Sequence, residues 1–344
     1  MLELDGKDAG GQFVRTALAL SVLDDTPIRL RNIRGGRSTP GLRPQHVAVI
    51  EVLSAITDAS VSGNDVGSES VEFEPGEADD WTAGGIYSVD VGTAGSLTLL
   101  FDAVLPLATR LKSPLSVTAT GGTDVKWAPP ADYYARVKLP TVRRFGLGAA
   151  FEVHRRGFYP DGGGEATLHL WPSDLERIDH TARGELVGVD LYSTQSRSLA
   201  DADVAARQVD GALETLGESR ELGDSFEATT LVETTVASDS PGSAIVIRLE
   251  HGTGYAGVSA LGERGKPAET VGREAATDLL EPLDSPSPVD VHLADQLLVF
   301  LALAGGRLRL PEITDHVTTS LDLLEAFGYE GRFESEANGG VVTV

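Results

Sequence analysis

Strand-like and helix-like segments alternate along most of this chain of 344 residues. Apolar residues at helical spacing predict helices over residues 13–23, 43–55, 96–108 and 132–145. Alternating or short apolar runs predict strands over residues 28–33, 71–75, 85–91, 115–119, 151–155 and 165–171. Strand pairs and helices recur roughly every 60 to 80 residues, which is typical of an α+β fold with a repeated unit. No Gly-x-Gly-x-x-Gly sequence follows a predicted strand, so the pattern does not favour a Rossmann nucleotide site.

The segment from about residue 184 to residue 283 has a strand and helix content of its own. Strands are predicted over 185–193, 229–237 and 244–250, and helices over 200–218 and 266–280. A Ser-Pro-Ser-Pro sequence at 285–288 closes the segment, and the main pattern resumes with an apolar helix over 293–304. We therefore predict a large domain formed by residues 1–183 and 284–344, interrupted by a small inserted α/β domain of residues 184–283.

The chain is strongly acidic, with 52 acidic and 28 basic residues and a formal net charge of −24. Only five of the basic residues are lysines, and 41% of all residues are hydrophobic, which is too many for an acidic disordered chain. An acidic surface with little lysine suits a folded protein that stays soluble at very high salt, so we expect a halophilic protein. The charge disfavours a wide electrostatic footprint on nucleic acid but permits a local arginine site for one or two phosphates.

Three absences narrow the class of protein further. No apolar run approaches the ~18 residues of a membrane span. The acidic start, Leu2-Glu3-Leu4-Asp5, lacks the basic residues of a signal peptide. The chain has no cysteine, which excludes disulfides, thiolate nucleophiles and thiolate metal sites. We expect a cytoplasmic protein with no membrane partner, and no sequence feature identifies a protein partner.

The segment from Arg156 to Gly164 contains three consecutive glycines after Pro160-Asp161. Such glycines permit positive φ angles, close backbone approach and exposed N–H groups. The segment is therefore either a tight turn between two strands or a cradle for an anion.

Two loops near the N-terminus combine glycine with arginine. In the first, Asp8-Ala9-Gly10-Gly11-Gln12 precedes a predicted helix that carries Arg15. An anion at the start of this helix would meet free N–H groups and a cation; the alternative is a simple helix cap. In the second, Arg34-Gly35-Gly36-Arg37 is followed by Arg43-Pro44-Gln45-His46, which suggests a phosphate site or else a solvated loop.

Three further clusters carry polar residues on loops or at helix starts. Gly121-Gly122-Thr123-Asp124 and Pro129-Pro130-Ala131-Asp132 read as a turn and a capped helix start. His292-Leu293-Ala294-Asp295-Gln296 opens an apolar helix. Thr314-Asp315-His316 contains a histidine that is either structural or catalytic. The order of Ser, His and Asp and the spacing of His and Glu match no known hydrolase or zinc motif.

With these blocks in place, the chain resembles the RNA 3′-terminal phosphate cyclase family almost from end to end, most weakly in the inserted segment. The resemblance rests on five ordered blocks, each weak alone: Gly10-Gly11-Gln12 with Arg15, residues 33–46, residues 121–124 with 128–132, residues 156–164, and Leu293-Ala294-Asp295-Gln296-Leu297. It implies a fold of three repeated units, each with two helices on a four-stranded sheet, and a small inserted α/β domain.

The resemblance also implies an ATP-dependent reaction in three steps. A histidine, matched here by His316, attacks the α-phosphate of ATP, AMP passes to an RNA 3′-phosphate, and the neighbouring 2′-hydroxyl displaces AMP to leave a 2′,3′-cyclic phosphate. A neutral imidazole is a competent nucleophile at phosphorus, and the transfers need charge stabilisation more than proton chemistry. Arg15 and Arg37 match positions that support catalysis. Positions implied to bind the nucleotide or RNA end are Gln12, Arg34, Gln45, Pro130, His292, Asp295 and Gln296.

The chain departs from the family pattern at two positions that the resemblance implies for the site. Asp8 stands where a glutamate helps to hold a divalent metal, Mg²⁺ or Mn²⁺, so the carboxylate is one methylene shorter. His292 stands where an aromatic ring stacks on adenine in the best-known member, and imidazole stacks more weakly.

Two other functions share this fold. A cyclase-like protein of ribosome assembly binds RNA partners without adenylation, and the presence of His316, Arg37 and Gln45 counts against it. An enolpyruvyl transferase shares the repeated unit but needs a different set of side chains for its substrate.

Overall fold

The computed structural model describes residues 1–219, 222, 228–336 and 339–344. The first repeated unit consists of β1 (Leu2–Asp5), α1 (Gly11–Leu23), β2 (Ile28–Arg31), α2 (Pro44–Thr57), β3 (Ser60–Ser62) and β4 (Val71–Glu74). The second consists of β5 (Gly85–Asp90), α4 (Leu97–Val104), β6 (Leu115–Gly121), a helical segment, β7 (Ala149–Arg155) and β8 (Gly164–Leu170). That helical segment runs through α5 (Ala131–Tyr133), the π-helical turn η2 (Tyr134–Lys138) and α6 (Leu139–Arg144).

The third unit is split by an insertion after its first strand. It consists of β9 (Ile178–His180), α9 (Val291–Ala304), β14 (Gly306–Leu310), α10 (Asp315–Ala326), β15 (Arg332–Ser335) and β16 (Gly340–Thr343). Short helices α3 (Ala78–Trp81), η1 (Leu105–Thr109) and η4 (Glu281–Asp284) join or flank these elements.

The three units share one sheet topology. Their strand orders are β1-β2-β4-β3, β5-β6-β8-β7 and β9-β14-β16-β15. In each sheet the first two strands pair in parallel across an intervening helix, and the remaining pairs are antiparallel. The prediction of an α+β fold with repeated units of two helices on a four-stranded sheet is confirmed.

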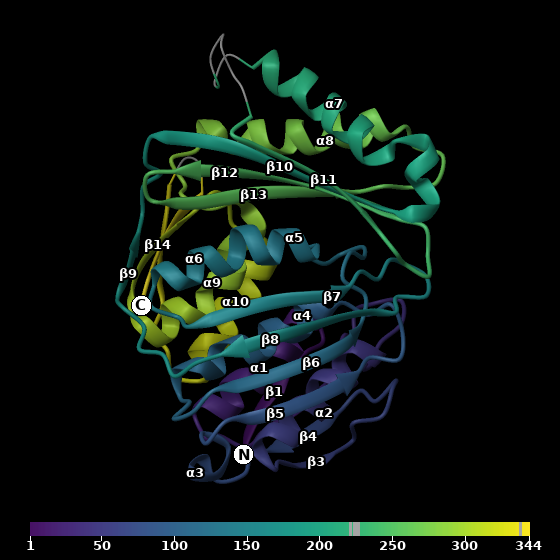
Figure 1. Ribbon diagram of the computed structural model, residues 1–344. Helices are drawn as coiled ribbons and strands as arrows, with labels where there is room; N and C mark the ends of the chain where they lie inside the picture. Colours follow the sequence, from purple (N-terminus) through teal and green to yellow (C-terminus); the bar gives the residue numbers. More distant parts are fainter. Residues whose placement is uncertain (220–221, 223–227, 337–338) are drawn as a thin grey trace.

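The insertion between β9 and α9 forms a fourth sheet with its own helices. Its elements are β10 (Leu186–Ser196), η3 (Arg197–Ala202), α7 (Val204–Gly217), β11 (Thr230–Val236), β12 (Ser243–His251), β13 (Gly254–Leu261) and α8 (Ala268–Leu280). The helices α7 and α8 cover one face of the sheet around a separate apolar core. The opposite face turns toward α5 and α6 of the second unit (Figure 1). The domain limits at 184 and 283 stay a prediction.

The helices of the three units pack against one another in the middle of the large core, and the sheets lie outside them (Figure 1). Helix α1 touches α2, α4 and α10, so residues at its N-terminal end meet residues from all three units. No helix in the described ranges has both the length and the apolar character of a membrane span.

Local chemistry explains why some observed helices and strands differ in extent from the predicted ones. The strand predicted over 28–33 ends at Arg31 because Asn32 turns the chain with a φ of 50°. Helix α2 begins with Pro44 at its first position, where a missing N–H costs no hydrogen bond. The spacing of apolar residues predicted no helix or strand after residue 304, where the third unit continues with helix α10, which carries His316.

Candidate active site

A cavity of about 740 Å³ opens where the three units and the insertion meet. Its wall is formed by the N-terminal ends of α1 and α2, by α4 and the loop before α5, by α9 and α10, and by two residues of β13. Nine of the eleven residues predicted for the site line this cavity: Gln12, Arg15, Arg34, Arg37, Gln45, His292, Asp295, Gln296 and His316. The topology thus brings together residues more than 300 positions apart in the sequence.

The N-terminal end of α1 faces the cavity without a side-chain cap. The N-cap residue is Gly10, and among the residues that the structure describes no side chain caps the helix with a hydrogen bond. A Cβ on Gly10 would lie 3.6 Å from Nη2 of Arg37 and 3.7 Å from Cε1 of His316. The free N–H groups, the positive helix end and two of the predicted catalytic side chains therefore meet around one point, an arrangement suited to an anion.

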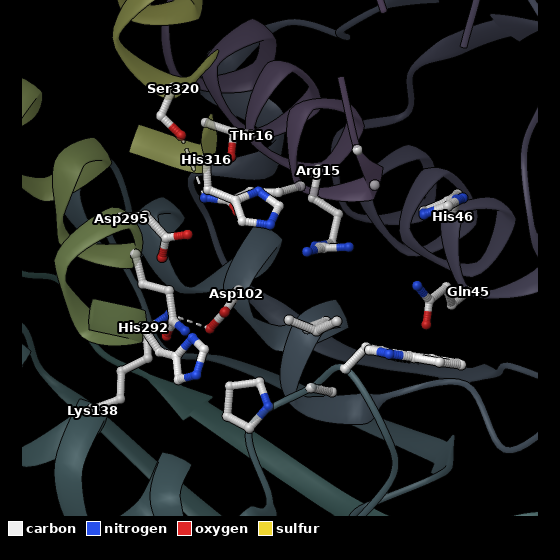
Figure 2. A pocket seen from close by; sticks show the side chains of 18 of the residues that line it. Arg15, Thr16, Gln45, His46, Asp102, Lys138, His292, Asp295, His316 and Ser320 are labelled. Carbon is white, nitrogen blue, oxygen red and sulfur yellow. Dashed lines mark hydrogen bonds and ion pairs between the residues drawn. The ribbon is translucent and has the colours of Figure 1, made fainter. Parts of the chain in front are cut away.

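His316 lies in the first turn of α10, after the N-cap Thr314, whose hydroxyl accepts from the backbone N–H of Val317 at 3.2 Å. Partial burial lowers the pKa of His316, and the nearby cations Arg37 and Arg15 lower it further. The imidazole is therefore neutral at neutral pH, with a free lone pair. Figure 2 shows His316 and Arg15 pointing into the same hollow.

Arg15 reaches the cavity from the second turn of α1 with only 9% of its surface exposed. Burial lowers its pKa to about 10, and the carboxylates of Asp102 and Asp295 offset part of this effect. The guanidinium stays charged at neutral pH. It is a fixed, largely desolvated cation of the kind that binds phosphate strongly.

The cavity wall opposite His316 contains a buried ion pair that the sequence did not suggest. Lys138, which is 2% exposed, donates to Asp102 on α4 (Figure 2). Burial lowers the pKa of Lys138, and Asp102 counteracts this. Asp295 lies next to this pair, and burial raises its pKa to about 6 although His292, Lys138 and a hydrogen bond with Gln12 favour its charged form.

His46 is a further cavity residue, and it stands beside the predicted Gln45. Its Nδ1 accepts from the backbone N–H of Arg43 at 3.0 Å, so the proton of the neutral ring lies on Nε2. Burial and the cations Arg15, Arg34 and Arg43 lower its pKa to about 3. The buried Nε2 has no hydrogen-bond partner among the described residues, and a Cβ on Gly11 would overlap it. His46 is thus a fixed neutral donor at the cavity. In the sequence, the signal that could have identified it as a cavity residue was its place at the start of a helix.

The remaining predicted residues differ in what they touch. Gln12 donates to the hydroxyl of Ser320 on α10 at 3.4 Å, and Gln45 accepts from the backbone N–H of Ser96 at 3.4 Å. Arg34 donates to the carbonyl oxygens of Thr39 and Gly41, both at 3.0 Å, so part of its donor capacity holds its own loop. Within the part of the chain that the structure describes, the buried Oε1 of Gln296 has no hydrogen-bond partner.

Two predicted residues lie outside the cavity wall. Pro130 is buried as the N-cap of α5, and its neighbour Pro129 lines the cavity instead. Asp8 is exposed on the loop before α1, and the part of the chain that the structure describes has no cluster of three metal-ligating side chains. A single carboxylate fits Mg²⁺ that is otherwise held by substrate phosphates and water.

The glycine-rich segment 156–164 does not line the cavity but braces its wall. Arg156 pairs with Asp124 at 2.9 Å and with Asp132 at 2.7 Å. Burial lowers the pKa of Arg156, and the two carboxylates more than offset this and raise it. Gly162, with a φ of 70°, packs against the backbone of Ala94 so closely that a side chain would clash. The segment is a packed turn that ties together the two ends of the loop before α5.

Comparison with known proteins places these features in a family. A family model for the RNA 3′-terminal phosphate cyclase matches residues 7–330. The RNA 3′-terminal phosphate cyclase of Halobacterium salinarum is 45% identical over 346 residues, which cover 98% of each chain. That of Pyrococcus furiosus is 39% identical and covers 95% of this chain and 93% of its own. That of Archaeoglobus fulgidus is 40% identical and covers 95% of each.

Proposed function

The chain belongs to the RNA 3′-terminal phosphate cyclase family, and from that premise we propose that it is an ATP-dependent ligase that converts an RNA 3′-terminal phosphate into a 2′,3′-cyclic phosphate. We further propose that the reaction passes through a covalent adenylate on His316. The observation that carries the second proposal is the position of a neutral imidazole beside Arg37, Arg15 and the uncapped end of α1.

In the first step a ring nitrogen of His316 attacks the α-phosphorus of ATP, the N–P bond forms, and pyrophosphate leaves. A ring that is neutral at neutral pH supplies the lone pair without prior loss of a proton. Arg15, Arg37 and the N–H groups of α1 line or face the same cavity and would stabilise the negative charge that develops on the phosphoryl oxygens.

The nucleotide would lie along the wall formed by α9, α10 and the loop before α5. His292, Asp295 and Gln296 line this part of the cavity and are proposed to hold the adenosine, with Pro130 behind Pro129. Gln12, Arg34 and Gln45 would bind the phosphates or the RNA end. Asp8 would hold a divalent metal, which would neutralise the triphosphate.

In the later steps the RNA takes the place of pyrophosphate. A 3′-phosphate oxygen attacks the phosphorus of the adenylate, the N–P bond breaks, and His316 leaves as the neutral ring with the one proton that it carried before the first step. The 2′-hydroxyl then attacks the RNA phosphorus, loses its proton to solvent, and AMP leaves. Both steps collect negative charge, which the same fixed cations would stabilise.

Labelling with ATP that carries radioactive phosphorus at the α-position tests this scheme. With Mg²⁺ or Mn²⁺, the protein is expected to acquire an acid-labile label that RNA with a 3′-phosphate removes. His316→Ala is expected to abolish the label, whereas His154→Ala, at an exposed histidine on β7, is expected to keep it.

The outcomes separate the proposed enzyme from an RNA-binding relative without adenylation. Label that persists in His316→Ala would place the adenylate on another residue. A wild-type protein that binds RNA ends but neither binds nor transfers the nucleotide would support the non-catalytic function instead.

We also propose that the protein is halophilic. The net charge of −24 makes the folded state repel itself at low ionic strength, and salt screens this repulsion. The urea concentration at the midpoint of unfolding is expected to rise between low and molar KCl. An equal midpoint in both would contradict the proposal.

A further inference from the structure

Trp127 is an exposed tryptophan at the mouth of the cavity. It lines the cavity, yet 95% of its surface is accessible. The two other tryptophans are more enclosed, with Trp81 at 1% and Trp171 at 44%. A large aromatic ring left in water at the edge of a binding site has no structural purpose in the free protein, and it offers a flat face to a ligand.

The fold holds this ring outward. Trp127 has a φ of 62°, a left-handed conformation that is rare for a bulky residue and often marks a functional position. The loop that carries it runs from Asp124 to Asp132, and Arg156 pairs with both of these ends. Val125, two residues before Trp127, is buried. The loop is therefore anchored on both sides, and the indole is presented from a fixed base.

We propose that the indole of Trp127 is the stacking platform for a nucleobase at the 3′ end of the RNA substrate. The proposal rests on the function proposed above, because it names how that site holds its RNA. Proteins commonly bind single-stranded ends by stacking bases on aromatic side chains, and every base offers a flat face. The platform is therefore expected to tolerate any terminal base.

The charge of the protein favours such a contact. A net charge of −24 repels a polyanion, and the neighbouring Lys126 is paired with Glu263 at 2.9 Å, so it is not a free cation beside the ring. Contacts with phosphate also weaken as salt rises. Stacking does not depend on net charge, so it holds RNA where the wide basic surface of many RNA-binding proteins is absent.

Position within the cavity favours RNA over ATP as the occupant. The cavity residues Arg15 and His46 are 9% and 2% exposed, whereas Trp127 is open to solvent. An RNA chain that places its 3′-phosphate near His316 must leave through the mouth and pass the exposed rim. A nucleotide of the size of ATP has no chain to lead outward.

Fluorescence and kinetics together test the proposal. In a Trp171→Phe background, a short RNA with a 3′-phosphate, added without ATP, is expected to quench the emission of Trp127. Trp127→Ala is expected to raise the KM for this RNA roughly 5- to 100-fold, as alanine substitution of stacking residues does, and Trp127→Phe to restore most of the loss. The labelling of His316 by ATP in the absence of RNA is expected to be unchanged, and Trp171→Ala is expected to match the wild type in the labelling assay and in the KM for RNA.

Three results would overturn the proposal, the third of which concerns salt. The first is an unchanged RNA KM in Trp127→Ala, and the second is a raised KM for ATP in the labelling reaction, which would place the indole at the adenine. A failure of the proposed function can be told apart from a failure of this proposal, since it appears as absent labelling of the wild-type protein. The RNA-dependent quenching is measured without ATP, so it still decides the role of Trp127. The loss caused by Trp127→Ala is also expected to persist in molar KCl, whereas a loss that disappears with salt would contradict stacking.

Discussion

Asp295 allows a prediction about the cost of building this site. Its carboxyl group lies in the cavity wall next to the Lys138–Asp102 pair, and burial raises its pKa from 3.8 to about 6. At about 1.36 kcal/mol for each pKa unit, the charged form therefore costs the folded state about 3 kcal/mol. Asparagine has almost the same shape and no charge, so Asp295→Asn is expected to stabilise the protein at neutral pH by up to about 3 kcal/mol.

The raised pKa of Asp295 also predicts how the effect of Asp295→Asn on stability changes with pH. Between pH 4 and pH 6 the folded state keeps a proton on Asp295 that the unfolded state has already lost. The contribution of Asp295 to stability is therefore fully present below pH 4 and is lost as the pH rises through about 6. The advantage of Asp295→Asn is expected to be small near pH 4 and to reach its full size above pH 6.

The assay is urea unfolding at fixed salt across this pH range, with Asp210→Asn on the exposed face of α7 as the control. The labelling of His316 by ATP, measured on the same variant, is expected to fall because Asp295 lines the proposed nucleotide site. If Asp295→Asn is less stable than the wild type at pH 7.5, or if its effect is the same at every pH, then Lys138 and Gln12 stabilise the carboxylate more than burial destabilises it. The reasoning would then be refuted.

Three further predictions concern the frame and chemistry of the site. Arg156→Met leaves the buried carboxylate of Asp124 and the partly buried one of Asp132 without their cation, and it is expected to cost about 3–5 kcal/mol in urea unfolding. Arg307→Gln, in an exposed pair, is expected to cost less than about 1 kcal/mol, and equal effects would contradict the bracing role. Gly11→Ala forces a Cβ into the imidazole of His46, so it is expected to abolish labelling by ATP while the circular dichroism spectrum is unchanged. A fully active variant would show that this ring can move freely. As the pH falls, the labelling rate is expected to stay level until the pH passes the lowered pKa of His316, and then to decrease. Arg37→Gln removes one cation and is therefore expected to move this decrease to higher pH. An unchanged pH profile would contradict the influence of Arg37 on the ring.

The short ordered blocks singled out Arg34, Arg37 and Asp295, and the family resemblance singled out His316. All four line the cavity, and their roles there stay a prediction. Trp127 and the Lys138–Asp102 pair were not predicted. A tryptophan beside two prolines and a lysine within a helix look ordinary in sequence, and only their exposure or burial makes them informative.

The sequence by itself determined the repeated α+β pattern, the place of the insertion in the chain order and the acidic charge. These properties follow from local spacing of apolar residues and from composition, which need no knowledge of distant contacts. It did not predict the last strands and helix of the third unit, including α10. The tertiary structure decided which residues meet, because the packing of α1 against α2, α4 and α10 brings Gly10, Arg37 and His316 to one point. It also decided the proton affinities, since burial and neighbouring charges set the pKa of Asp295, His46 and His316, and neither can be known before the fold is formed.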